Sequence, residues 1–98
     1  MFITITGSNH YLGVDSYMIN QELYLVKDIN NAYDDEAIKV VNEEDVKYGY
    51  VANSVNTVAR GTHSAGYIYN LIKDKTKVFI RFVLEDSVIA EIKEKTNK

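Results

Sequence analysis

The sequence predicts a mainly β fold, a small six-stranded barrel with one or two short helices inserted before the last two strands. Three observations lead to this prediction. Six short segments alternate apolar and polar residues, and segments rich in Gly, Asn and Asp separate the first four of them. A chain of 98 residues is too short for two full packed sheets. Closing one sheet into a barrel removes its exposed edges.

The first four strands are predicted from period-two alternation that ends in turn-forming residues. The first ends at Gly7, and the second ends in a stretch rich in Asn and Asp. The residues Asn42-Glu43-Glu44-Asp45 predict a tight hairpin between the third strand and the fourth. We expect these strands at residues 2–6, 21–27, 37–42 and 46–51.

Helical spacing of apolar residues then replaces the alternation. It predicts a helix over 52–60, capped by Asn53 or Ser54. A second short helix is predicted to be capped by Thr62-His63-Ser64 and to run through about residue 72. Two strands follow, at 77–84 and 88–92, and the polar residues 94–98 are expected to fray. In the first of these strands one face is predicted to carry Val78, Ile80, Phe82 and Leu84.

Composition predicts one globular domain, with a core of about residues 2–93 in the 98 residues. Hydrophobic residues make up 46% of the chain, which excludes a mainly disordered protein. Cysteine is absent, so disulfides and thiolate zinc sites are excluded. No secretion signal or bilayer-spanning run is visible, so we expect a cytoplasmic protein without membrane contact.

Charge is distributed unevenly along the chain. Residues 1–46 carry two basic and nine acidic residues, whereas residues 47–82 carry six basic residues and one acidic residue. The net charge of −3 argues against nucleic acid as a partner, but the basic middle segment permits a local anion-binding face. An ordinary solvated surface would account for the same pattern.

The most distinctive stretch runs from Asn30 to Val40 and reads Asn-x-x-Tyr-Asp-x-x-Ala-Ile-x-Val. A glycine-led loop with an aromatic pair precedes it at residues 7–13, and the step Gly49-Tyr50 follows it. In this order and at these spacings the three segments resemble the HIRAN domain over about residues 3–92. The Asn-to-Val run is quite specific, whereas the other two segments would be weak alone.

The resemblance implies a small OB-like β-barrel that binds DNA, notably single-stranded DNA with a free 3′ end. HIRAN domains are usually attached to helicase-like remodelling enzymes and are also found alone in bacterial proteins, the type that this chain resembles. In the family a Tyr-Asp pair stacks on the terminal base and hydrogen-bonds the 3′-hydroxyl. These roles fall on Tyr33 and Asp34. Packing of Tyr33 on the barrel and turn capping by Asp34 remain alternative roles.

The rest of the implied site comes from the first loop and from the start of the expected helix. It consists of His10 beside Tyr11, together with Tyr50 and Asn53, and the helix start would direct backbone N–H groups at a phosphate. The chain departs from the family pattern here. Asn9 and His10 stand where DNA-end binders carry Arg and Tyr, and Asn53 replaces a basic residue. Fewer cations predict weaker or different phosphate binding.

Catalytic and metal-binding patterns are weak. His10 and His63 lie more than fifty residues apart without a recognised ligand spacing. Ser64 beside His63 lacks the glycine pattern of a nucleophile elbow. The paired carboxylates occur in turns, where solvated charge is common. We therefore expect no enzyme, no metal and no cofactor.

Two functions remain open. The first is a non-enzymatic module that binds single-stranded DNA or its free 3′ end, working with a helicase or nuclease partner encoded elsewhere. The alternative is a protein–protein adaptor on the same barrel, which presents the acidic first half to a basic partner.

Overall fold

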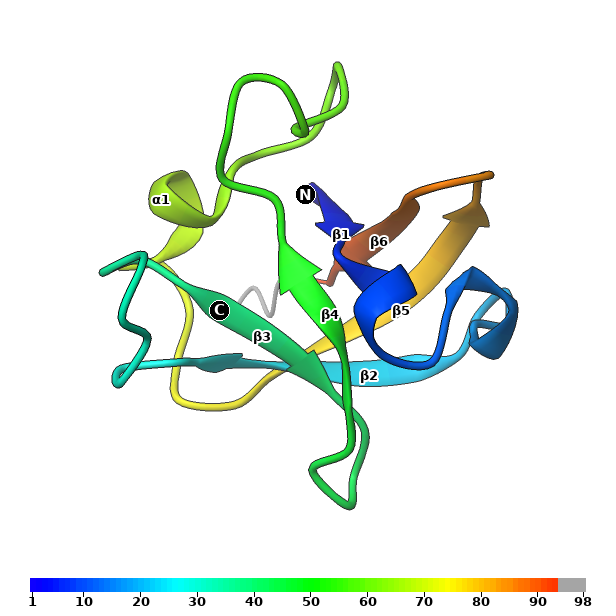
Figure 1. Ribbon diagram of the computed structural model, residues 1–98, viewed down its shortest axis with the longest axis horizontal. Coiled ribbons are helices and arrows are strands. Elements are labelled where there is room, and N and C mark those ends of the chain that lie inside the picture. The colour runs from blue at the N-terminus through cyan, green and yellow to red at the C-terminus, as the bar shows by residue number, and fades with distance from the viewer. Residues whose placement is uncertain (94–98) are drawn as a thin grey trace.

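The computed structural model describes residues 1–93, which form a closed antiparallel barrel (Figure 1). The strands pair in the order β1-β4-β3-β2-β5-β6, and β6 returns to pair with β1. The predicted six-stranded barrel is confirmed. The polar tail expected at 94–98 lies outside the described residues. The strands are β1 (Phe2–Thr6), β2 (Glu22–Lys27), β3 (Ile38–Val41), β4 (Lys47–Val51), β5 (Thr76–Val83) and β6 (Val88–Ile92).

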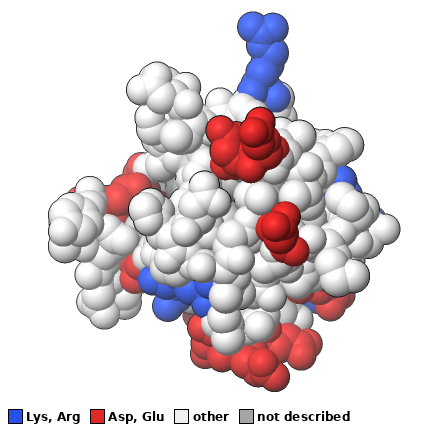
Figure 2. Space-filling model, turned by 45° about the vertical axis from the view of Figure 1, so that its right-hand side comes forward, with Lys and Arg blue, Asp and Glu red and all other residues white. Residues whose placement is uncertain are grey.

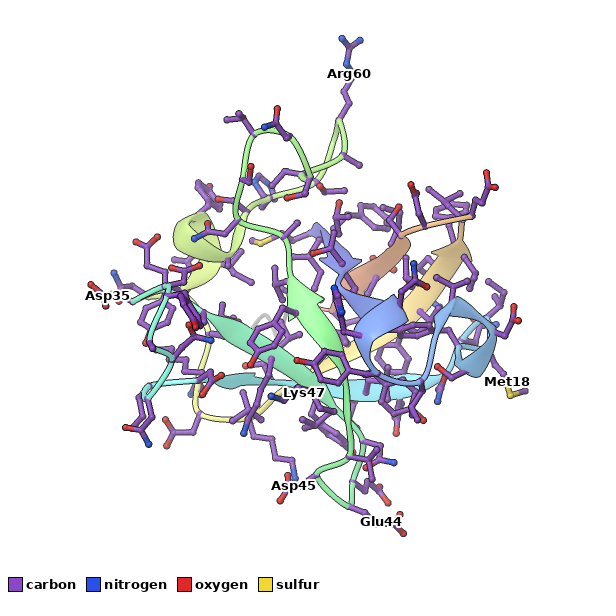
Figure 3. The ribbon with its side chains drawn as sticks, in the orientation of Figure 1. Met18, Asp35, Glu44, Asp45, Lys47 and Arg60 are labelled. Atoms are coloured by element: carbon purple, nitrogen blue, oxygen red, sulfur yellow. The ribbon has the colours of Figure 1, made fainter. Side chains whose placement is uncertain are left out.

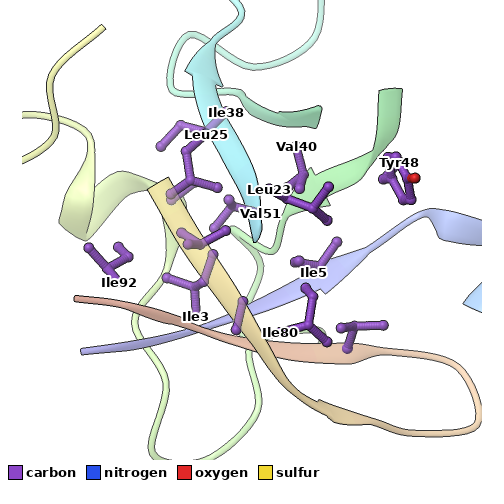
Figure 4. Close-up of a cluster of buried hydrophobic side chains, with 14 of the residues drawn as sticks. Ile3, Ile5, Leu23, Leu25, Ile38, Val40, Tyr48, Val51, Ile80 and Ile92 are labelled. Carbon is purple, nitrogen blue, oxygen red and sulfur yellow. The ribbon is translucent and has the colours of Figure 1, made fainter. Parts of the chain in front are cut away.

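The core fills the inside of the barrel with branched aliphatic side chains from every strand (Figure 4). Strand alternation places these residues inside because successive side chains point to opposite faces. Among the largest side chains buried completely are Ile3, Ile5, Leu23, Leu25 and Ile80. The inside of the barrel is therefore filled by a packed core.

The face predicted for β5 is only half correct. Val78 and Ile80 are fully buried, but Phe82 is 56% exposed and Leu84 is 48% exposed. The register against β6 shifts between Ile80 and Phe82, as in a β-bulge. The extra residue rotates the following side chains out of the alternation, and a bulge cannot be seen in an apolar pattern.

The helix predicted over 52–60 is wrong. Only one turn forms, in which the carbonyl of Ser54 accepts from the N–H groups of Thr57 and Val58, each at 2.9 Å. Hydrogen bonds to Thr4, on the outer face of β1, hold this segment in a non-helical path. Thr4 binds Ala52 N through its carbonyl at 2.8 Å and Ala59 N through its hydroxyl at 3.1 Å. These two tertiary bonds hold the segment across β1 and prevent a continuous helix.

The second predicted helix is present but shorter than expected. It is α1 (Ala65–Ile68), and the Ser64 hydroxyl caps it by accepting from Tyr67 N. A turn follows, in which Leu71 N donates to the Ile68 carbonyl at 2.8 Å. Glycine, aromatic and β-branched residues in this segment favour a helix weakly, which explains its early end.

The loop between β1 and β2 contains two short 3₁₀ helices that the sequence analysis did not predict, η1 (Ser8–His10) and η2 (Val14–Ser16). Tyr17 fixes this loop on the barrel. Its ring is buried and packs against Tyr48, with the ring centroids 5.3 Å apart. Its hydroxyl bonds Ser8 Oγ at 2.8 Å and donates to the Tyr48 carbonyl at 3.1 Å. The loop therefore has a defined position beside β4.

The hairpin predicted at residues 42–45 is confirmed. Asn42 Oδ1 accepts from the N–H groups of Glu44 and Val46, at 2.8 and 3.0 Å. Asp45 takes the left-handed conformation, with φ of 66°, which Asp tolerates better than most residues. The hairpin sets the start of β4 at Lys47.

Gly49 lies where β4 meets β1, and a side chain there has no space. A Cβ atom at this position would stand 2.7 Å from the Thr6 carbonyl oxygen, which is backbone and cannot move away cheaply. We expect Gly49→Ala to lower the free energy of unfolding by about 1–3 kcal/mol. Urea unfolding measures this loss.

The matched control is Gly66→Ala in α1. There a Cβ would stand 2.6 Å from Glu36 Oε1, the end of a flexible side chain that can rotate away. Because Ala favours a helix more than Gly by about 1 kcal/mol, this variant should be as stable as the parent or more stable. Equal losses in the two variants would contradict the argument.

The second stability prediction concerns pH. Burial raises the pKa of Tyr17 to about 12, whereas an unfolded tyrosine titrates near 10. The folded protein therefore keeps a proton that the unfolded chain releases between these values. The resulting stabilisation is complete below pH ~10 and is lost as the pH rises through the folded pKa.

We expect Tyr17→Phe to flatten this alkaline loss of stability. At neutral pH the variant should also lose about 1–3 kcal/mol, because it leaves Ser8 Oγ and the Tyr48 carbonyl without their partner. Urea unfolding from pH 7 to 12 measures both effects. The control is Tyr24→Phe, whose hydroxyl lies in an exposed contact. An unchanged slope in Tyr17→Phe would refute the assignment.

Candidate nucleic-acid interface

An open groove of about 550 Å³ lies on the outside of the barrel. It is formed where three connections leave the strands: the β2–β3 turn, the loop after β1, and the segment after β4 (Figure 1). Five of the six site residues implied by the family resemblance line it, and His10 does not. The lining consists of Thr6, Tyr11, Asn31, Tyr33, Asp34, Ala37, Tyr50, Val51, Ala52, Asn53, Ser54 and Thr57.

The β2–β3 turn is organised by Asn31, which the sequence analysis did not single out. Its Oδ1 atom accepts from Tyr33 N at 2.9 Å and from Asp34 N at 3.0 Å. Asp34 Oδ1 in turn accepts from Glu36 N at 2.8 Å, so the turn-capping role considered for Asp34 is correct. The Tyr33 side chain is 97% exposed, so it does not pack on the barrel. The turn therefore presents a free aromatic ring at the groove.

Asn53 connects this turn to α1. Its Nδ2 group donates to Asp34 Oδ2 at 3.1 Å and to Glu36 Oε1 at 3.4 Å, and its Oδ1 atom accepts from Gly66 N at 2.8 Å. Because no helix starts at Asn53, the row of helical N–H groups expected there for a phosphate does not exist. The groove instead has an amide donor beside a carboxylate.

The aromatic wall of the groove comes from Tyr11 and Tyr50, whose ring centroids are 6.4 Å apart. The Tyr50 hydroxyl donates to Asp28 Oδ2 at 2.6 Å and accepts from Lys47 Nζ at 3.0 Å. The Lys47 ammonium also lies 5.3 Å from the Tyr11 ring centroid and 5.0 Å from that of Tyr50. Figure 3 shows Lys47 beside β4.

Hydrogen bonds and burial in this wall shift the pKa values of Asp28, Lys47 and Tyr50. The bond from Tyr50 lowers the pKa of Asp28, and the bond to Tyr50 raises the pKa of Lys47. Desolvation, with the bond to Asp28, raises the pKa of Tyr50. At neutral pH the wall therefore holds a carboxylate, a neutral phenol and an ammonium.

The first loop contributes one of its two implied residues to the groove. His10 is exposed at the end of η1 and is not among the lining residues, so its role in the site stays a prediction. Tyr11, the next residue, lines the groove instead. The geometry of the 3₁₀ turns decides which side chain points inward, and no sequence pattern revealed it.

A second, smaller hollow of about 350 Å³ adjoins the groove and shares Asn53 and Ser54 with it. Its walls include His63 and Tyr67, whose rings stack with centroids 4.4 Å apart and planes 15° apart. The Tyr67 side chain is 59% exposed, so this stacked pair is open to solvent on one side.

The basic residues of segment 47–82 do not gather at one place. Lys77 pairs with Glu22 and Arg81 pairs with Glu91. Arg60 projects from a loop tip at the opposite side of the view from Lys47 (Figure 3). On the face in Figure 2 the basic residues likewise occur at several separate places, some of them next to acidic residues.

Within residues 1–93, no group of three or more His, Asp or Glu side chains is arranged to hold a metal ion. The same described part of the chain has no helix whose length and hydropathy would allow it to cross a membrane.

Comparisons with known proteins agree with this architecture. The model of the HIRAN domain family matches residues 1–87. The crystal structure of the HIRAN domain of human HLTF is similar, with a TM-score of 0.68 and 21% identity, over 92% of this chain and 69% of that chain. At this identity the likeness shows the fold alone. No match was found among curated proteins. The resemblance and the OB-like barrel predicted from the sequence are confirmed.

The turn that presents Tyr33 should depend on the Asn31 side chain. We expect Asn31→Ala to speed amide hydrogen exchange at Tyr33 and Asp34, because both N–H groups lose their acceptor, and to cost about 0.5–1.5 kcal/mol of stability. Exchange followed by NMR measures this effect. The control is Asn30→Ala at the exposed neighbouring position. Unchanged exchange in Asn31→Ala would show that the backbone alone holds the turn.

Proposed function

The chain belongs to the HIRAN domain family, and we propose on that basis that it captures single-stranded DNA at a free 3′ end. HIRAN domains are DNA-binding modules that are not catalytic by themselves. The observation that supports the proposal most strongly is the groove, in which an exposed tyrosine ring lies beside a carboxylate–amide pair. We further propose that a helicase or nuclease partner acts on the captured end.

Stacking supplies the affinity in this proposal. Tyr33 offers both faces of an exposed ring, and Tyr11 and Tyr50 offer further aromatic surface in the same groove. A base can stack on such rings whatever its sequence identity, for roughly 1–3 kcal/mol per base. At about 550 Å³ the groove falls in the range of small-ligand sites and can hold one nucleotide.

Asp34 and Asn53 supply the recognition of the end. A 3′-hydroxyl can donate to Asp34 Oδ2, and it can accept from the Asn53 amide in exchange for the long 3.4 Å bond to Glu36 Oε1. At an internal linkage the 3′ oxygen is esterified, so it has no proton to donate. The proposed site therefore consists of Tyr11, Tyr33, Asp34, Tyr50 and Asn53, the implied residues that line the groove, and His10 lies outside this lining.

The first test is fluorescence anisotropy of a short labelled single strand whose 3′ end is free or phosphorylated. We expect binding at low salt that weakens when the 3′ end is blocked. Tyr33→Ala should weaken binding about 5- to 150-fold, the equivalent of one lost stacking contact. The control is Tyr24→Ala, since Tyr24 does not line the groove.

Three results would count against the proposal. Unchanged binding by Tyr33→Ala would remove this residue from the site, and equal affinity for free and blocked ends would remove end recognition. Absence of binding even at low salt would reject DNA as the ligand and favour the adaptor alternative.

A further inference from the structure

We infer that Lys47 is the residue that binds the DNA backbone phosphate at the groove. The inference rests on the proposed function and extends it to a residue outside the implied site. It is prompted by the lack of Lys and Arg at the site positions Asn9, His10 and Asn53, since a bound single strand brings phosphates to the groove.

Lys47 does not itself line the groove, but the hairpin places it against two of the rings that do. It is the first residue of β4, directly after the turn that Asn42 fixes. Its ammonium lies over the Tyr11 and Tyr50 rings, both of which line the groove. The aliphatic stem is partly covered, so the side chain loses less freedom on binding than a fully solvated lysine.

The hydrogen bonds leave this ammonium ready for an anion. The Tyr50 hydroxyl accepts one of its three N–H bonds at 3.0 Å, and that hydroxyl gives its own proton to Asp28. Two N–H bonds of Lys47 are left for phosphate oxygens. Asp28 is meanwhile engaged by Tyr50 and by Asn31 Nδ2 at 3.3 Å, so it does not take the ammonium in a direct ion pair.

The layout of the groove indicates which phosphate is bound. The turn that carries Tyr33 and the loop that carries Tyr11 lie on either side of β4 (Figure 1). A nucleotide with its base on Tyr33 and its hydroxyl at Asp34 extends its 5′-phosphate across β4 toward the Tyr11–Tyr50 wall. Lys47 is the ammonium seated on that wall.

Other cations of the described chain are less suitable. Lys77 and Arg81 are paired with carboxylates on β2 and β6, and Arg60 projects from a distant loop tip (Figure 3). Lys39 is the exception, because it pairs in register with Tyr50 across β3 and β4 and so lies on the same outer face. It is therefore the competitor that the experiment must separate from Lys47.

The experiment measures the salt dependence of binding to a free-ended single strand. Each phosphate contact contributes about −0.7 to the slope of log K against log salt concentration for single strands. We expect Lys47→Gln to reduce the magnitude of the slope by about 0.7 and to weaken low-salt binding roughly tenfold. Lys47→Arg should restore both. Lys77→Gln, which makes the same change in net charge on β5, should leave the slope unchanged.

The outcomes separate this inference from the proposed function. A parent protein that fails to bind would refute the proposed function. A parent that binds, with an unchanged slope in Lys47→Gln or with the slope change in Lys39→Gln instead, would overturn only the role of Lys47. Preference for a free 3′ end should persist in Lys47→Gln because the Asp34 contact is intact. If Lys47→Gln fails to fold, Lys47→Met, which keeps the stem over the rings, provides the same test.

Discussion

The pairing of β1 with both β4 and β6 is the constraint on which the rest of this structure depends. It closes the barrel and buries Ile3 and Ile5 at the centre of the core. On the outer face of the same strand, Thr4 anchors the segment that follows β4. The absence of a side chain at Gly49 lets β4 approach Thr6 closely enough to form this seam. The pairing of β1 with β4 thus fixes both strands that contribute residues to the groove.

The groove itself is shaped by polar contacts rather than by the core. Asn31 folds the β2–β3 turn, Asn53 joins that turn to α1, and Tyr17 attaches the first loop to the barrel. Asn31 satisfies backbone N–H groups of a turn that has no strand partner, whereas Asn53 and Tyr17 tie connections to neighbouring elements. The barrel supplies a rigid base, and three side-chain hydrogen-bond centres set the positions of the residues that a ligand would meet.

The sequence predicted the strands well because their signal is local. Alternation identified all six, with boundaries within about two residues of those observed. It failed where a distant partner decides the conformation. Val55 and Val58 suggested a helical face, yet Val55 is 95% exposed and the segment follows bonds to Thr4, about fifty residues earlier. The bulge after Ile80 was missed for the same reason, because a bulge is defined only by the pairing of β5 with β6.

The candidate site divides in the same way. Tyr33 and Asp34 could be named from the sequence because they lie in one contiguous motif, whereas Asn31, Asp28 and Lys47 have partners that only the fold brings near. Composition alone also pointed away from nucleic acid, since a net charge of −3 gives no general attraction to a polyanion. Under the proposed function, affinity for DNA then comes from short-range contacts, which one nucleotide in a groove can provide. Recognition of a strand end suits such a protein, because an end offers a base face and a free hydroxyl while demanding few phosphate contacts.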